Sequence, residues 1–116
     1  MKDELLAALD GVTRIRGVRG ALVVTDDDGM IVADALMEGV RGSAIAALAA
    51  SLALRFGNAA RTTGVGAPQF YQLQAEKGTL VVVPGPSGVL VVVIGDPELN
   101  VGLVRLEMLR VAEVVR

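Results

Sequence analysis

The chain has 116 residues and a formal net charge of −2, with 53% hydrophobic but only 3% aromatic residues. This length suits one domain with a single core, which Val, Leu, Ile and Ala must fill. Because Cys and His are absent, thiolate nucleophiles, Ser-His triads, imidazole bases and most zinc sites are excluded. The acidic balance, without a cluster of basic and aromatic residues, argues against a nucleic-acid partner. We predict no cofactor and no metal.

The mean hydropathy, +0.57, is high for a chain of this size. No uninterrupted apolar run approaches the ~20 residues of a membrane-spanning helix. The sequence therefore predicts no membrane insertion, and we attribute the excess of apolar residues to surface covered in an oligomer. Residues 1–4 lack the basic and apolar regions of a signal peptide, which predicts a cytoplasmic protein.

The first predicted elements are a short helix and a β-hairpin. Asp3 is expected to cap the helix, which runs to about Val12. Two β-rich runs at 21–25 and 30–34 then flank the Asp-Gly signal of a tight turn. Residues 35–41 are predicted to connect this hairpin to a central helix.

A central helix is predicted from Ser43, as its N-cap, to about Arg61, because Ala and Leu dominate and proline is absent. A bulky stripe at helical spacing is expected to pack on a sheet: Ile45, Leu48, Leu52, Phe56 and Ala59. No residue from Gly42 to Leu54 is charged. The opposite, mostly small face is therefore predicted to meet another protein surface: Ala47, Ala50, Ser51, Leu54, Asn58 and Arg61.

Three strands are predicted after the central helix, at 69–75, 79–83 and 89–94. The first has mixed alternation, whereas the other two are apolar on both faces, so helices must cover both sides of the sheet. A third helix is predicted from about Asn100 to Val115, with ordinary surface charge. Its apolar stripe is Val101, Val104, Met108, Val111 and Val115.

Two polar motifs are interpreted as structural. Asp26, Asp27 and Asp28 could group carboxylates around a metal, but the further ligands of a calcium loop are missing. A solvated hairpin turn is the favoured interpretation. The Gly64-Val-Gly66 motif follows a helix rather than a strand, which disfavours a phosphate-binding loop.

Arginines supply all the charge in and around the central helix. Arg41, Arg55 and Arg61 are the only charged residues between Glu38 and Glu76. They either serve solubility and the helix dipole or form a basic rim that orients an acidic partner.

Several apolar patterns resemble the Roadblock / dynein light-chain family, and within it the bacterial MglB-type proteins. The resemblance covers about residues 5–115 and indicates a single such domain over 1–116. It is carried by the order of elements, the hairpin segments Gly20-Ala-Leu-Val-Val and Asp28-Gly29-Met-Ile-Val-Ala, the Ala/Leu-rich central helix, and the closing Leu99-Asn-Val-Gly-Leu-Val-Arg-Leu-Glu107.

The resemblance implies an α+β fold of order α-β-β-α-β-β-β-α, with a five-stranded antiparallel sheet covered by helices in a profilin-like layering. It implies homodimers in which the central helices pack side by side and the third strands pair, joining two sheets into one. The dimer interface is then assigned to Ala47, Ala50, Leu54, Phe70, Gln72, Leu73 and Gln74.

The resemblance also implies a partner, a small Ras-like GTPase of the MglA type. The homodimer would stimulate GTP hydrolysis by repositioning the GTPase's own catalytic groups, as a regulator without an active site. A non-catalytic scaffold in a GTPase or sensor-kinase complex is the alternative, and a small-molecule sensor ranks last because few polar residues point inward. Partner binding is assigned to Ala47, Ala50, Ser51, Leu54, Arg55, Asn58 and Arg61.

Overall fold

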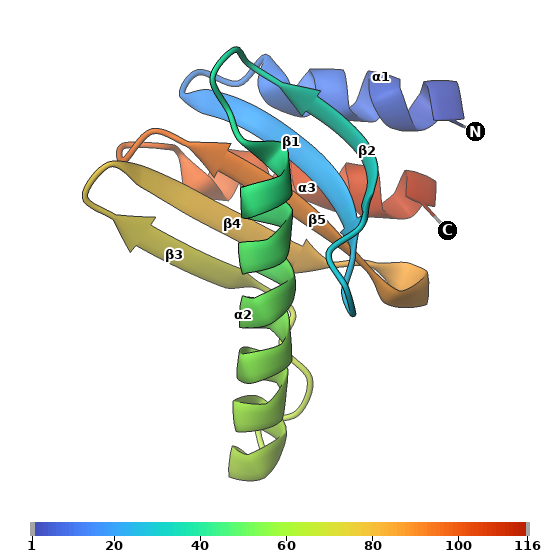
Figure 1. Cartoon of the computed structure of the whole chain (residues 1–116), viewed down its shortest axis with the longest axis vertical. Coiled ribbons are helices and arrows are strands. Elements are labelled where there is room, and N and C mark those ends of the chain that lie inside the picture. Colours follow the sequence, from blue (N-terminus) through green and yellow to red (C-terminus); the bar gives the residue numbers. More distant parts are fainter. Residues whose placement is uncertain (1, 116) are drawn as a thin grey trace.

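Helices and strands follow one another in the predicted order in the computed structural model, which describes residues 2–115. The chain begins with a helix and a hairpin, continues through a long helix and three strands, and closes with a helix (Figure 1). The elements are α1 Lys2–Thr13, β1 Val18–Thr25, β2 Ile31–Leu36, α2 Gly42–Thr63, β3 Tyr71–Ala75, β4 Gly78–Pro84, the short 3-10 helix η1 Pro86–Gly88, β5 Val89–Gly95 and α3 Val101–Val115.

The five strands form one antiparallel sheet in the order β2-β1-β5-β4-β3. At its centre Val91 of β5 lies opposite Val23 of β1 on one side and Val83 of β4 on the other. The central strands are apolar on both faces, as the sequence indicated, and their side chains are almost all buried. The edge strands β2 and β3 are each paired on one side only.

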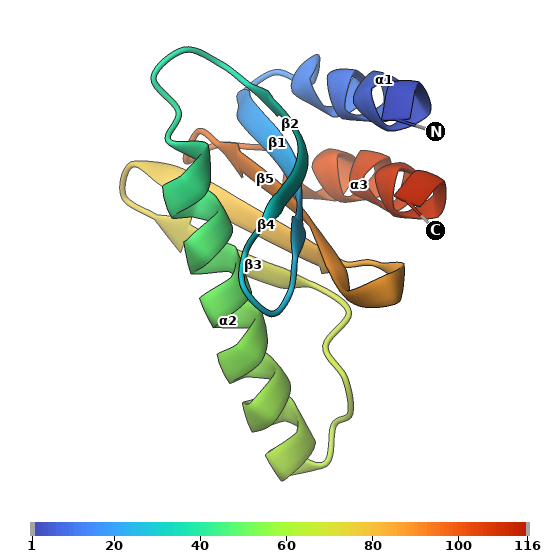
Figure 2. The ribbon, with the colours of Figure 1, turned by 45° about the vertical axis from the view of Figure 1, so that its right-hand side comes forward.

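Helices cover both faces of the sheet, which confirms the prediction made from its two apolar faces. Figure 2 shows α1 and α3 side by side on one face and α2 on the other. Under α1 and α3 the core includes Leu9, Met108 and Val93. Under α2 it includes Leu22, Leu90 and Ala49. The buried stripe of α3 consists of Val104, Met108 and Val111, as predicted.

Both predicted N-caps are wrong. Asp3 lies within the first turn of α1, where its charge still suits the helix dipole. Ser43 also lies inside its helix, because α2 begins at Gly42 and the N-cap residue is Arg41, without a side-chain cap. A Cβ at Gly42 would stand 2.7 Å from the Leu36 side chain. The helix therefore starts at the residue that lets it come close to the end of β2.

The C-terminus of α2 explains the Gly64-Val-Gly66 motif. Gly64 adopts the left-handed conformation, with φ 82° and ψ 6°, and its N–H donates to the last carbonyls of the helix. Glycine is favoured at this position because it lacks the Cβ that makes positive φ costly. The motif is a helix cap, as the structural interpretation expected.

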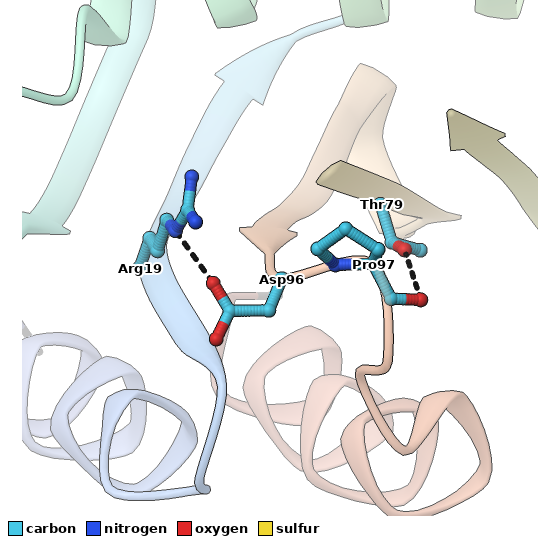
Figure 3. A network of polar contacts seen from close by, with 4 residues as sticks. All are labelled: Arg19, Thr79, Asp96 and Pro97. Atoms are coloured by element: carbon cyan, nitrogen blue, oxygen red, sulfur yellow. Dashed lines mark hydrogen bonds and ion pairs between the residues drawn. The ribbon is translucent and has the colours of Figure 1, made fainter. Parts of the chain in front are cut away.

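Polar contacts fix the turn between β5 and α3 (Figure 3). Arg19 of β1 pairs with Asp96 at 2.7 Å, and the hydroxyl of the buried Thr79 donates to the Pro97 carbonyl at 3.4 Å. The Gln74 side-chain amide donates to the same carbonyl at 3.1 Å. Since the ion pair is about half exposed, it adds little stability. These contacts orient the turn and hold the end of β3 against it.

Candidate protein-interaction surface

Small residues of α2 face the sheet. Ala46, Ala49 and Ala50 are buried, and Ala53 packs against the same layer of the core. Gly57 is buried as well, beneath the Arg61 side chain of the same helix. The spacing of the alanines, three and four residues, places them on one side of the helix. Because these side chains are short, the helix axis can approach the strands closely. Large residues of the sheet, such as Leu22, fill the layer between them.

The predicted packing stripe of α2 is therefore partly wrong. Ile45 and Leu52 are half-buried against the core. Leu48 and Phe56 remain 44% and 42% exposed, and Ala59 is exposed as well. The bulky residues are rotated away from the sheet because the small residues occupy the contact. They lie on a flank of the helix rather than beneath it.

Ala50, which was assigned both to partner binding and to the dimer interface, is also misplaced. It is only 7% exposed and lies on the sheet side of α2, so it cannot contact another protein unless the helix detaches from the sheet. The other assigned residues of α2 are exposed and remain candidates: Ala47, Ser51, Leu54, Arg55, Asn58 and Arg61.

An apolar flank runs from α2 to the edge strand β3. The Phe56 ring lies 5.2 Å from the Tyr71 ring, centroid to centroid, and Tyr71 faces the core beneath α2. Leu73, two residues further along β3, points to the same face of the sheet and is 42% exposed. We define the β3 flank as Leu48, Leu52, Phe56 and Leu73. The sequence assignment found only the last of these.

The two edges of the sheet differ in what they offer to another strand. β3 pairs with β4 in regular register from Tyr71 to Ala75 and carries no charged residue and no proline. Its outward backbone groups have no strand partner within residues 2–115. In β2, the register with β1 shifts at a bulge, and Asp34 is exposed. A bulge and a charge protect an edge from pairing, so β3 is the edge open to another strand.

The remaining residues assigned to the dimer interface lie on or beside this edge. Gln72 and Gln74 are exposed, and Gln74 is already held by Pro97. Phe70, just before β3, is half-buried against the core under α3, with the Arg105 guanidinium 4.7 Å above its ring.

The second half of α2 extends beyond the sheet, as Figures 1 and 2 both show. Leu54 and Arg55 are exposed there. The Arg61 side chain folds back along the helix, donating to Asn58 Oδ1 at 2.8 Å and lying over Gly57. This part of the helix presents a mixed surface of small, apolar and basic groups.

The Asp26-Asp27-Asp28 segment forms the turn between β1 and β2. Asp28 accepts hydrogen bonds from the Thr25 hydroxyl and from the Met30 N–H. These bonds to the charged form lower the pKa of the Asp28 carboxyl. In the described residues 2–115, no group of three acidic, His or Cys side chains could hold a metal. The turn interpretation holds for Asp27 as well, because its Oδ1 accepts a hydrogen bond from the Asp28 N–H at 2.8 Å. Asp26 is anchored through its backbone N–H, which donates to the Gly88 carbonyl.

α2 is long and apolar enough, by length and composition alone, to cross a membrane. An 18-residue window within Gly42–Thr63 has a mean hydropathy of 1.3 although it contains the charged Arg55, so an interrupted apolar segment reaches the length that no uninterrupted run was expected to reach. Core helices of folded proteins pass the same test, but only 22% of this window is buried. Much of an apolar helix is therefore left uncovered by its own chain.

The sequence profile of the Roadblock/LC7 domain matches residues 4–94. The chain belongs to the Roadblock/LC7 domain family. Over 119 aligned residues it is 32% identical to the uncharacterized protein MJ1340 of Methanocaldococcus jannaschii, covering 100% of this chain and 97% of that protein. The family assignment made from the apolar patterns is thus confirmed.

Solved structures share the Roadblock fold with this chain. A Roadblock/LC7 domain from Streptomyces avermitilis has a TM-score of 0.85 at 20% identity, covering 95% of this chain and 92% of that one. The gliding protein MglB from Thermus thermophilus has a TM-score of 0.84 at 23% identity, and the match covers 98% of this chain and 87% of that one. A chain of the LokiProfilin1/rabbit actin complex is a more distant match, with a TM-score of 0.62 at 15% identity. The match covers 99% of this chain and 96% of that one. The predicted fold class and its profilin-like layering are confirmed.

Sequence reasoning missed the exposed β3 flank of this Roadblock domain. One signal could have revealed it. Gly57 lies in the middle of a helix, where glycine costs about 1 kcal/mol relative to alanine and usually has a packing reason. Together with Ala46, Ala49 and Ala53 it marks a seam of small residues at helical spacing. The three alanines of that seam, rather than the bulky stripe, meet the sheet, and Gly57 lies beneath the Arg61 side chain.

Proposed function

We propose that this Roadblock domain forms a homodimer that binds a small Ras-like GTPase and stimulates its GTP hydrolysis. The observation that carries the proposal is the exposed side of α2, which has no charged residue from Gly42 to Leu54 and only arginines, Arg55 and Arg61, beyond. An exposed apolar helix of this length needs a protein cover. The likeness of the fold to MglB supports the class of partner.

The homodimer forms through β3 and the β3 flank. Pairing of two β3 strands across a two-fold axis would join the two sheets and satisfy the outward backbone groups of both edges. The same axis brings the flanks of the two α2 helices together. Leu48, Leu52 and Phe56 of each subunit then become buried, and their burial supplies the apolar contribution to association.

The GTPase binds the part of α2 that the dimer leaves open. Ala47, Ser51 and Leu54 lie on the side of the helix away from the β3 flank, on the same face as the hairpin turn. Small side chains there let another backbone approach closely. Arg55 is exposed, and its side chain makes no hydrogen bond or ion pair within residues 2–115. It supplies a positive charge that can orient an acidic partner.

The basic groups act by orientation rather than by entering the GTPase site. Arg61 is held along its own helix by Asn58 instead of extending outward. The regulator therefore repositions the catalytic groups of the GTPase, as the resemblance to MglB-type proteins implies. An inserted arginine contributes about 10³ to 10⁵ in rate, so the two mechanisms predict very different consequences of removing one.

The test is single-turnover GTP hydrolysis by a small Ras-like GTPase, for which one encoded near this chain is the first choice. We expect the wild-type chain to accelerate hydrolysis. Arg55→Ala and Arg61→Ala should weaken binding while leaving most of the acceleration at saturation. Arg14→Ala, at the α1 end of the molecule, serves as the matched control and should change neither.

Two results would replace this proposal. Loss of nearly all acceleration in either variant with binding intact would indicate an inserted arginine. Intact binding of the wild-type chain with unchanged hydrolysis would identify a scaffold, the alternative that the resemblance left open.

A further inference from the structure

We propose that this chain binds a small zwitterion, a free amino acid with an aliphatic side chain, in a hollow beside α2. The hollow has a volume of about 370 Å³ and lies between the second half of α2, the loop that follows it and the turn between β1 and β2. Its walls carry both signs of charge. Ligand sites in proteins combine apolar walls with a few polar groups in this way.

Opposite charges lie on opposite walls of the hollow and do not form an ion pair. Arg61 belongs to the α2 wall, and Asp26 and Asp27 belong to the hairpin turn. No ion pair joins them in residues 2–115, and the Asp26 carboxylate accepts no hydrogen bond there. Electrostatic attraction would bring the guanidinium and the carboxylates together if the contacts that hold each of them allowed it. A molecule with an anionic and a cationic end can bridge them.

Hydrogen bonds hold the two charged walls in place. Asn58 accepts a hydrogen bond from Arg61 at 2.8 Å and holds the guanidinium against Gly57. On the other side, the Asp26 N–H donates to the Gly88 carbonyl at 2.9 Å, which anchors the turn to the segment before β5. Contacts with Asn58 and Gly88, rather than an ion pair with each other, thus position the charged groups.

Tyr71 lies at the inner end of the same hollow. Its hydroxyl donates to the Ala53 carbonyl at 3.4 Å, which leaves the phenol oxygen able to accept a bond from an ammonium group. Burial raises the pKa of the phenol, and Arg61 and Asp26 both act on its ionisation. All three groups line the hollow.

The rest of the wall favours an aliphatic side chain. Leu54, Pro68 and Leu90 line the hollow between the charged groups. A ligand with only charged ends would leave these surfaces in water, whereas a branched aliphatic side chain covers them. The carboxylate of the amino acid would face Arg61, and its ammonium would face Asp26, Asp27 and the Tyr71 oxygen.

The test is a titration of the full ¹⁵N-labelled chain with L-valine, followed by NMR. We expect saturable amide shifts confined to the hairpin turn, the segment around Gly57 to Arg61, and Tyr71. Valinamide keeps only the ammonium, and 3-methylbutanoate keeps only the carboxylate. Each should bind about tenfold or more weakly, because one set of charge-assisted hydrogen bonds is lost.

Variants assign the binding to the hollow. Arg61→Gln and Asp26→Asn should each abolish saturable shifts, while Arg14→Gln and Asp10→Asn, which change the same charges at exposed positions on the α1 side, should keep them. Unchanged spectra of the ligand-free variants away from the substitution show that they remain folded. The absence of saturable shifts at millimolar L-valine, or equal binding of the singly charged analogues, would overturn the proposal. Since no GTPase is present, the result is independent of the proposed regulatory function.

Discussion

The ring of Phe56 lies on that of Tyr71, with centroids 5.2 Å apart and planes inclined by 32°. Phe56 comes from the half of α2 that extends beyond the sheet, and Tyr71 is the first residue of the edge strand β3. The Tyr71 hydroxyl also donates to the carbonyl of Ala53, one turn earlier in the helix. These contacts connect α2 to the strand edge, so that both parts of the proposed dimer surface keep one relative position.

Leu48→Glu is expected to convert the proposed homodimer into a monomer. The substitution places a charge in the β3 flank, where burial against a second copy would require the carboxylate to lose its hydration. Sedimentation velocity at micromolar protein concentration measures the change. Leu106→Glu is the matched control, because Leu106 is an equally apolar and even more exposed residue on α3.

The Leu106 variant should remain dimeric. A wild-type chain that sediments as a monomer would contradict dimerisation itself. A dimeric Leu48→Glu variant would show that the flank is not part of the interface.

Ala50→Leu is expected to destabilise the fold rather than to act on a partner. Ala50 is buried on the sheet side of α2, and additional methyl groups in a filled layer cost about 1 to 3 kcal/mol. Urea denaturation, under conditions where both proteins are in the same oligomeric state, gives the free energy of unfolding. Ala47→Leu, at an exposed position on the same helix, should change it by less than about 0.5 kcal/mol. Equal effects of the two substitutions would contradict the orientation of α2 described above.

Gly29→Ala is expected to loosen the contact between the hairpin turn and α2. Gly29 has a φ of +69°, and a Cβ there would stand 3.1 Å from the carbonyl oxygen of Ala46. A methyl group therefore meets both an unfavourable backbone conformation, which costs about 1 kcal/mol or more, and a rigid helix backbone. A lower melting temperature is the expected result. Gly39→Ala, also at positive φ but with open space around it, separates the two contributions.

Tyr71→Phe is expected to reduce the loss of stability at high pH. Burial raises the pKa of Tyr71 above its ordinary value of about 10 in the folded state. The folded chain thus holds the phenol proton more tightly than the unfolded chain does. The contribution of Tyr71 to the free energy of unfolding is fully present below pH about 10 and is lost as the pH rises through the pKa of Tyr71 in the folded state. Urea midpoints at neutral and alkaline pH should show a flatter decline in the variant, and identical declines would contradict the assignment.

The sequence predicted the order of elements and the two covered faces, because these depend on local patterns, whereas the edge position of β3 was implied by the family resemblance. Strand runs such as 89–94, apolar throughout, require a cover on both sides regardless of its identity. The hairpin followed from the Asp-Gly turn signal. Segment ends were predicted to within a few residues, but the caps were not, since Gly42 begins α2 for reasons of contact with Leu36.

The orientation of α2 could not be predicted from periodicity. Ile45, Leu48, Leu52 and Phe56 repeat at the same spacing as Ala46, Ala49, Ala53 and Gly57, one residue later. Both series are apolar, so the helical pattern fits either side. Which series faces the sheet depends on how much space the side chains of the sheet leave beneath the helix. Leu22, Leu80 and Leu90 fill the layer beneath the helix, and at native packing density only small residues fit above them.

The contrast between the two sheet edges determines how far assembly can proceed. The β2 edge carries a bulge and the charge of Asp34, whereas β3 is regular and uncharged. A chain with two receptive edges could add copies without end and form fibres. In the proposed homodimer, pairing of the two β3 strands would use the receptive edge of each copy. The joined sheet would then end in two β2 edges and stop growing after two copies, so the closed edge would protect an apolar chain of 116 residues from polymerisation.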